Sequence, residues 1–188
     1  HLKYIPYENF DCLNGKITSL KRQDMFNKVI MHNRGGICFE LNGLYNWLLE
    51  SLGFEVTSYS ARFIDKMETY QLRRHRVMCV ALGDKRYLTD VGVNSESPRV
   101  PLEIVDGLIQ SDGISQYKFT RSEFWGWLVW QKERGKIWKR LFGFTEFYLG
   151  GRVKYRYKIN TGAELKEILW EYFGINVEYR LKDDGIEY

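Results

Sequence analysis

The chain has 188 residues, three cysteines and a formal net charge of +4 at pH 7. A hydrophobic content of 44% argues against a disordered chain, and no apolar run reaches the roughly 20 residues that a membrane span needs. The small, scattered positive charge does not favour a nucleic-acid partner. Three scattered cysteines (Cys12, Cys38 and Cys79) do not form a disulfide framework and indicate a reducing, cytoplasmic compartment.

The first part of the chain is expected to be helical after an extended start. Residues 1–19 contain several chain breakers and indicate loop and extended structure. Apolar spacing then predicts a helix from Leu20 to about Met31, with Ser19 as its cap. After the break at 33–36, a continuous apolar stripe predicts a second helix from about Cys38 to Leu52, stopped by a glycine.

From Phe54 onward the apolar period changes to two, which is typical of strands. A strand is predicted from Phe54, and two more over Arg76–Leu82 and Arg86–Val91, joined by a tight turn at Gly83-Asp84. Residues 92–115 show a mixed pattern.

The last third of the chain carries two further signals. The Trp-rich stretch Glu123–Phe147 predicts a hairpin around residues 133–136. A capping box over Thr161–Glu164 predicts a terminal helix that stops at Gly174. Helices, then strands, then a helix predict an α+β fold.

Cys38 is the first residue of the second predicted helix, where a thiol gains reactivity. The free N–H groups and dipole of a helix N-terminus favour the thiolate, which is the attacking form. Gly35 and Gly36 leave room for a substrate, and a nearby backbone amide would stabilise an oxyanion. The alternative interpretation is a small buried side chain on the helix stripe.

A nucleophilic cysteine needs a base and a group that orients the base. Of the three histidines, His1 is at the terminus and His32 lies beyond the glycine break, so His75 is preferred. A two-residue turn pairs Asp90 with Val77 and puts Asp90 on the sheet face of His75, whereas a three-residue loop would separate them. The cysteines and histidines lack the short spacing of a zinc site, so no metal is expected.

Two segments resemble those of the arylamine N-acetyltransferases. The run Arg34-Gly35-Gly36-Ile37-Cys38-Phe39-Glu40-Leu41-Asn42 is similar to the active-site signature of that family, and Ile5-Pro6-Tyr7-Glu8-Asn9-Phe10 resembles its Pro-Phe-Glu-Asn-Leu element. His75 and Asp90-Val91-Gly92 follow in the family's order. The match to the family jumps around Phe147–Arg152, as though a long segment of the family's lid were missing. The helix with which the family begins has no counterpart in this sequence.

The resemblance implies three lobes around a cysteine-protease-like Cys-His-Asp core. A helical bundle over 1–53 would carry Cys38, a central antiparallel β-barrel over 54–148 would carry His75 and Asp90, and 149–188 would form a partial C-terminal α/β lid ending in a helix. Glu40 and Asn42 are expected to support the site from beneath.

The implied activity is a ping-pong transfer used in xenobiotic metabolism. Cys38 would take acetyl from the co-substrate acetyl-coenzyme A (acetyl-CoA) and pass it to an arylamine, hydrazine or N-hydroxyarylamine. His75 would assist the proton transfers and Asp90 would orient His75. The sequence identifies neither the residues that bind coenzyme A nor the oligomeric state.

Two departures from the family concern substrates. Val93-Asn94 stands where the family has Phe-Gly, near the acceptor pocket, and Arg73-Arg74 precedes His75. These arginines would meet coenzyme A phosphates or remain solvated.

Three alternatives stay open from the sequence. The same triad would serve an amide synthase or another acyltransferase, or a thiol hydrolase of the papain and transglutaminase type. The third is a binding protein that keeps the fold without catalysis.

Overall fold

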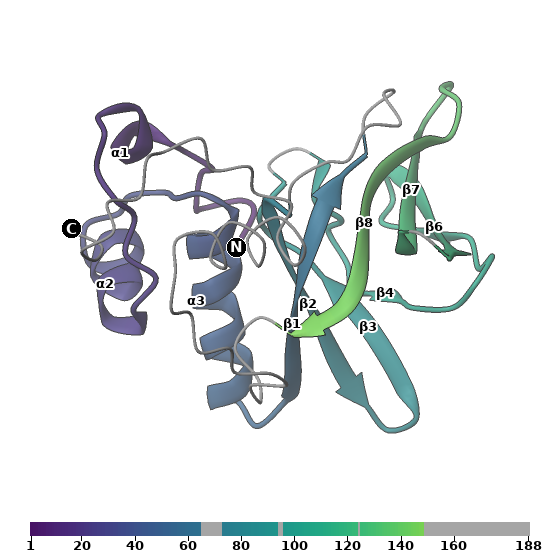
Figure 1. Cartoon of the computed structure of the whole chain (residues 1–188), viewed down its shortest axis with the longest axis horizontal. Coiled ribbons are helices and arrows are strands. Elements are labelled where there is room, and N and C mark those ends of the chain that lie inside the picture. Colours follow the sequence, from purple (N-terminus) through teal and green to yellow (C-terminus); the bar gives the residue numbers. More distant parts are fainter. Residues whose placement is uncertain (65–72, 94–95, 124, 149–188) are drawn as a thin grey trace, which may run out of the picture.

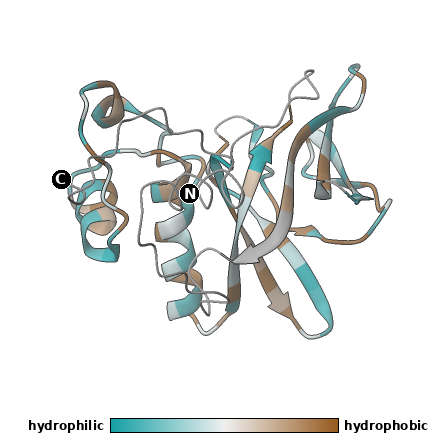
Figure 2. Ribbon diagram, in the orientation of Figure 1, coloured by the Kyte–Doolittle hydropathy of each residue, from teal (hydrophilic) through white to brown (hydrophobic). Residues whose placement is uncertain are grey.

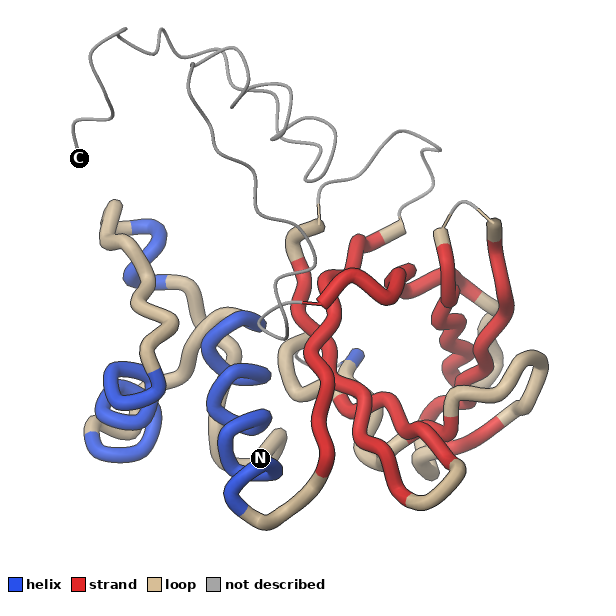
Figure 3. The backbone as a smooth tube through the Cα atoms, turned by 60° about the horizontal axis from the view of Figure 1, so that its bottom comes forward, coloured by secondary structure: helices blue, strands red, loops and turns tan. Residues whose placement is uncertain are grey.

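A computed structural model describes residues 1–64, 73–93, 96–123 and 125–148. A group of helices stands beside an antiparallel sheet that curves into a nearly closed barrel (Figures 1 and 3). The α+β class and the central barrel of the expected fold are therefore confirmed. The predicted lid over 149–188 and its terminal helix lie outside the described residues.

The helices differ from the expected ones before Cys38. A one-turn helix, α1 (Phe10–Leu13), interrupts a segment that was expected to have none. The predicted single helix begins at α2 (Arg22–Phe26) and widens into a π-helical turn, η1 (Asn27–Met31). Lys21, not Ser19, occupies the N-cap of α2, because the helix begins at Arg22 and not at Leu20. The Ser19 hydroxyl donates to Asp24 Oδ2 at 2.6 Å.

Helix α3 (Cys38–Ser51) matches its prediction and joins the helices to the barrel. Gly53 follows it with a φ of +89°, a left-handed conformation that suits glycine after a helix end. Leu41 and Leu44 pack in a small core with Val29 and Val91. The predicted apolar stripe was wrong at its far end, since Leu48 and Leu52 are 52% and 65% exposed.

The sheet contains eight strands among the described residues. They are β1 (Glu55–Phe63), β2 (His75–Leu82), β3 (Lys85–Thr89), β4 (Leu102–Glu103), β5 (Gln110–Ser111), β6 (Ser115–Ser122), β7 (Gly126–Glu133) and β8 (Lys139–Tyr148). All neighbours are antiparallel, in the order β4-β3-β2-β1-β8-β7-β6-β5.

Alternating side chains of these strands fill the barrel interior. Hydrophobic and hydrophilic segments alternate along the strands in Figure 2, and the buried set includes Val77, Leu88 and Phe142. The predicted hairpin at 133–136 is confirmed as β7 and β8, and β8 continues the sheet by pairing with β1. Strand β6 was missed, although Tyr117 and Phe119 face inward with the period of a strand.

The two edge strands of the barrel, β4 and β5, are joined by a side chain. The Glu103 N–H donates to Gln110 Oε1 at 2.7 Å, and Gln110 Nε2 donates to the Glu103 carbonyl at 2.8 Å. The amide of Gln110 thus replaces the peptide group of a neighbouring strand. This pair of bonds covers the open edge that an incomplete barrel leaves.

Gln110→Met is expected to lower the free energy of unfolding by about 1–3 kcal/mol, because it leaves the Glu103 N–H and carbonyl without these bonds. Urea unfolding followed by circular dichroism measures the change. Gln116→Met, at an exposed position of the neighbouring strand β6, is the matched control and should have an effect within about 0.5 kcal/mol. Equal stability of the two variants would contradict the role of Gln110.

Candidate active site

The β2–β3 hairpin brings His75 and Asp90 together. Its strands pair from Leu82 with Lys85 to Met78 with Thr89, around the two-residue turn that the sequence predicts. The same register places Asp90 opposite Val77 and on the face of His75. His75 Nε2 donates to Asp90 Oδ2 at 2.6 Å, and both side chains are fully buried. The predicted side-by-side placement of these two residues is therefore confirmed.

Asn42, one turn beyond Cys38 on α3, ties the helix to this hairpin. Its Nδ2 donates to Asp90 Oδ1 at 2.9 Å and also to the Arg76 carbonyl, while its Oδ1 accepts the Val91 N–H at 2.9 Å. The Gly92 N–H also donates to Asp90 Oδ1, at 2.8 Å. Both oxygens of Asp90 are thus held, which leaves its carboxylate one orientation toward His75.

Cys38 is the first residue of α3 and lies against the irregular segment that follows Asp90. Ile37 occupies the N-cap, and the buried Cys38 Sγ donates to the Arg74 carbonyl at 3.5 Å. A Cβ on Gly92 would come within 2.8 Å of both the Cα and the Cβ of Cys38. Only glycine allows this close approach, so Gly92 determines how near the hairpin lies to the thiol.

The imidazole of His75 is enclosed by aromatic rings. Phe63 and Phe142 lie with ring centroids 4.9 and 5.2 Å from it. Burial alone lowers the pKa of His75, but the charge and hydrogen bond of Asp90, with a further contribution from Cys38, raise that pKa to about 9. His75 Nδ1 is buried and has no hydrogen-bond partner in the described part of the chain. With Nε2 bound to Asp90, Nδ1 is the ring nitrogen left to interact with another group.

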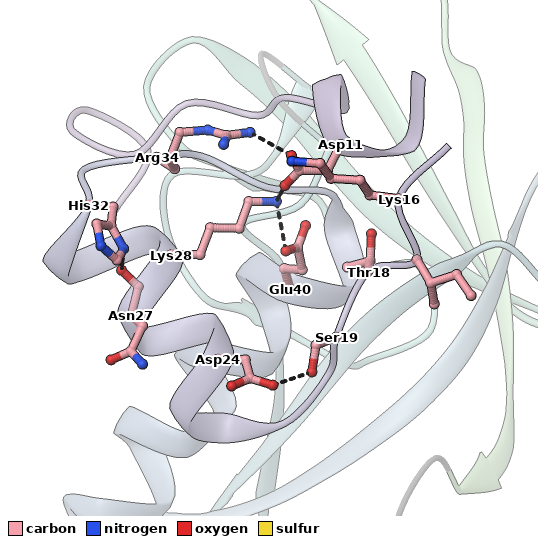
Figure 4. A pocket seen from close by; sticks show the side chains of 11 residues that line it. Asp11, Lys16, Thr18, Ser19, Asp24, Asn27, Lys28, His32, Arg34 and Glu40 are labelled. Carbon is pink, nitrogen blue, oxygen red and sulfur yellow. Dashed lines mark hydrogen bonds and ion pairs between the residues drawn. The ribbon is translucent and has the colours of Figure 1, made fainter. Parts of the chain in front are cut away.

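A network of charged side chains supports the loop before Cys38 (Figure 4). Glu40 Oε2 accepts the Ile37 N–H at 2.9 Å, and Lys28 Nζ donates to Glu40 Oε1 at 2.8 Å. Arg34 donates to Glu8 Oε1 from Nη2 at 2.7 Å and from Nε at 3.0 Å. The expected supporting roles of Glu40 and Asn42 are visible in these contacts.

The segment around Tyr7 lies directly on the glycines before Cys38. Tyr7 forms a parallel β-bridge with Gly36, and the Glu8 N–H donates to the Gly36 carbonyl at 3.1 Å. A Cβ on Gly35 would come within 2.0 Å of the Pro6 carbonyl oxygen. Partial burial raises the pKa of Tyr7, and the charge of Cys38 raises it further. The two segments that carry the family resemblance, around Tyr7 and before Cys38, therefore pack directly against each other.

Several contributors were not predicted from the sequence. The two phenylalanines around His75 come from strands far apart in the chain, and Lys28 comes from an irregular helix. Asn42 was expected to support the site, but its particular contacts with the hairpin were not predicted; its helical spacing of four from Cys38 was the available signal. Of the pair Val93-Asn94, which stands where the family has Phe-Gly, Val93 packs against the barrel core and Asn94 lies outside the described residues.

Two cavities lie near this site. One of about 530 Å³ adjoins Asp90 and the 97–101 loop. One of about 380 Å³ adjoins Lys28 and Glu40 (Figure 4). The described ranges hold no cluster of three His, Cys, Asp or Glu side chains able to bind a metal. They also hold no helix that is long and apolar enough to cross a membrane.

Known proteins are similar to this chain in sequence and in fold. The N-acetyltransferase family model matches residues 1–149. An arylamine N-acetyltransferase of Mycolicibacterium smegmatis is 36% identical over 151 residues, which cover 77% of this chain and 54% of that protein. The corresponding enzyme of Escherichia coli K12 is 30% identical over 148 residues, 77% of this chain and 52% of that protein.

A solved structure agrees with these matches. Arylamine N-acetyltransferase from Mycobacterium tuberculosis superposes with a TM-score of 0.72 at 30% identity, covering 77% of this chain and 55% of that one. The chain spans about half the length of the curated relatives it matches. The family match and the shared fold together show that the chain belongs to the arylamine N-acetyltransferase family.

Proposed function

We propose that this protein is an acyltransferase of the arylamine N-acetyltransferase type, with Cys38, His75 and Asp90 as its catalytic residues. The observation that carries the proposal is the buried His75–Asp90 hydrogen bond of 2.6 Å beside a cysteine at the start of a helix. A matching protein of Salmonella typhimurium is named an arylamine N-acetyltransferase and N-hydroxyarylamine O-acetyltransferase. The Mycobacterium marinum enzyme, 27% identical with a TM-score of 0.69, was solved with coenzyme A. These relatives support acetyl-CoA as donor and an arylamine or N-hydroxyarylamine as acceptor. A hydrazine acceptor is part of the proposal from the sequence resemblance alone.

The first half-reaction starts from an ion pair in which the proton of Cys38 Sγ already resides on His75 Nδ1, in agreement with the raised pKa of His75. The thiolate attacks the thioester carbonyl carbon of acetyl-CoA, and a backbone amide at the start of α3 stabilises the oxyanion. The carbon–sulfur bond to coenzyme A then breaks. The departing thiolate of coenzyme A takes the proton from His75, and Cys38 retains the acetyl group.

In the second half-reaction the acceptor nitrogen attacks the carbonyl carbon of acetyl-Cys38. His75 takes a proton from the attacking nitrogen, and the collapse of the tetrahedral intermediate expels the Cys38 thiolate. Asp90 keeps the Nε2–H of His75 directed toward itself, so that Nδ1 faces the sulfur throughout.

The wider expectations from the sequence belong to the same proposal. We assign the helical lobe to 1–53, the barrel to 54–148 and a partial lid to 149–188. All three cysteines are free thiols, with Cys12 exposed and the other two buried. Free thiols are typical of a reducing compartment, which supports a cytoplasmic location.

Incubation with acetyl-CoA alone should place one acetyl group on Cys38, detectable by peptide mass spectrometry. Cys12→Ala is the control and should be acetylated like the wild type, whereas Cys38→Ser should not form the thioester. Absence of acetyl-Cys38 in the folded wild type would overturn the proposal.

The same assay separates the remaining alternatives. An amide synthase would form acyl-Cys38 but pass it to no arylamine or hydrazine, and a thiol hydrolase would release the acyl group to water. Malonyl-CoA belongs in the donor set, because a matching fungal protein of Gibberella moniliformis is named an N-malonyltransferase.

Gly92→Ala should slow single-turnover acetylation of Cys38 by about tenfold or more, since the added methyl group displaces the nucleophile from His75. Gly83→Ala, at an open hairpin turn with a φ of +60°, is the control. It should cost some stability but leave the acetylation rate unchanged. Wild-type acetylation by Gly92→Ala would contradict the close approach.

The raised pKa of His75 also predicts a pH dependence of stability. Its pKa is about 9 in the folded protein against 6.5 for a free histidine. Protonated His75 therefore stabilises the fold fully below about pH 6.5, and this contribution disappears as the pH rises toward about 9. Chemical unfolding at several pH values should show this decrease, and Asp90→Asn should flatten it. Parallel curves for the two proteins would exclude the Asp90 charge as the cause.

A further inference from the structure

Glu40 has two roles that conflict at the start of α3. Its buried carboxylate accepts the Ile37 N–H at 2.9 Å and so holds the first turn of the helix. A negative charge at this end stabilises the helix. However, Glu40 lies only two residues from Cys38 in the same turn, where its charge opposes formation of a thiolate.

Lys28 supplies the opposite charge to Glu40. Its Nζ lies 2.8 Å from Glu40 Oε1, 2.8 Å from Asp11 Oδ2 and 3.9 Å from Glu8 Oε1, and Figure 4 shows it between Asp11 and Glu40. Arg34, the other cation of the network, pairs with Glu8 and Asp11 instead. The ion pair of Glu40 is thus made by Lys28, and the side chain of Lys28 is only 17% exposed.

Lys28 remains an ammonium at this position. Burial lowers its pKa, but hydrogen bonds to Asp11 and Glu40 outweigh burial and raise the pKa above its ordinary value. The charge on Glu40 therefore remains neutralised at any pH at which Cys38 would react.

The backbone of Lys28, as well as its side chain, holds the region around the start of α3. Lys28 lies within Asn27–Met31, where each turn holds an extra residue, a feature often found at functional sites. Its own carbonyl accepts the Arg34 N–H at 3.1 Å. Lys28 consequently fixes the loop before Cys38 through its backbone and Glu40 through its side chain.

We propose that Lys28 is a positioning residue for Cys38: it neutralises Glu40, so that a carboxylate can hold the first turn of α3 without opposing the thiolate. The proposal rests on the proposed role of Cys38 as nucleophile and adds a residue that does not touch the substrate.

Other groups also act on the thiol and define the background of the test. His75 on β2, with Asp90 behind it, favours the thiolate, and so does the N-terminus of α3. Tyr7 on the N-terminal segment interacts electrostatically with Cys38, and Glu40 acts from the helix itself. Substitution of Lys28 changes none of these groups. It also removes an ion pair from Asp11, which keeps its pair with Arg34, so the combined variant with Glu40→Gln isolates the charge on Glu40.

The test measures the rate of Cys38 alkylation by iodoacetamide against pH, in a Cys12→Ala background and with the label mapped by mass spectrometry. Lys28→Met should move the profile to higher pH and reduce the rate at neutral pH by about tenfold, which corresponds to one pKa unit. Lys28→Arg should restore most of the rate. Lys85→Met, which removes an exposed ion pair with Glu103 at the turn end of the β2–β3 hairpin, is the matched control and should change nothing.

Two further variants separate charge from folding. Lys28→Met combined with Glu40→Gln keeps an oxygen for the Ile37 N–H without the charge, and should return the profile toward the wild type. Glu40→Gln alone should move the profile to lower pH, which provides a test even if Lys28→Met does not fold. A wild-type profile for Lys28→Met, or a combined variant as slow as Lys28→Met, would overturn the proposal.

Alkylation also keeps this proposal separate from the acetyl-transfer function. If acetyl-Cys38 never forms but the alkylation profiles move as described, the proposed function fails and the role of Lys28 stands. If acetyl-Cys38 forms and the profiles do not move, only the role of Lys28 fails.

Discussion

The buried amide of Asn42 is the contact on which the rest of the site depends. It donates to Asp90 Oδ1 and the Arg76 carbonyl and accepts the Val91 N–H, so one side chain of α3 binds both strands of the hairpin. A buried amide with its hydrogen bonds satisfied is costly to displace, because every displaced group loses a partner away from water. The distance between the helical part and the barrel is therefore set at the point where Cys38 and His75 meet.

Around this contact, glycines determine how closely the backbone segments approach and charges determine their orientation. Gly92 lets the segment after Asp90 approach Cys38 closely, and Gly35 lets the segment around Pro6 lie on the loop before Cys38. Buried carboxylates at this point need cations, since an unpaired charge away from water is unstable. Lys28 and Arg34 meet that need. The same arrangement pairs the acidic side chains near the candidate nucleophile with two cations, so that none of the three carboxylates is left without an ion pair.

Regular parts of the fold were predictable from local pattern. Helix α3 and the β2–β3 hairpin follow from an apolar stripe and a two-residue turn, and the turn sets the register that joins His75 to Asp90. Irregular parts were not. The π-helical turn and the one-turn helix α1 are too short and irregular to leave an apolar repeat, whereas strand β6 was missed although its alternation is local. The exposed Leu48 and Leu52 show that an apolar stripe does not reveal how far a neighbouring element covers it.

The sequence by itself determined the family signature, the choice of Cys38, His75 and Asp90, and the parity that places the last two on one face. Each of these depends on residue identity or on spacing along one element, which the chain carries locally. Only the tertiary structure decided that Asn42 joins helix to hairpin, that Gly92 touches Cys38 and that Lys28 neutralises Glu40. These contacts join residues that are distant in the chain, and their geometry arises only when the helices pack against the barrel.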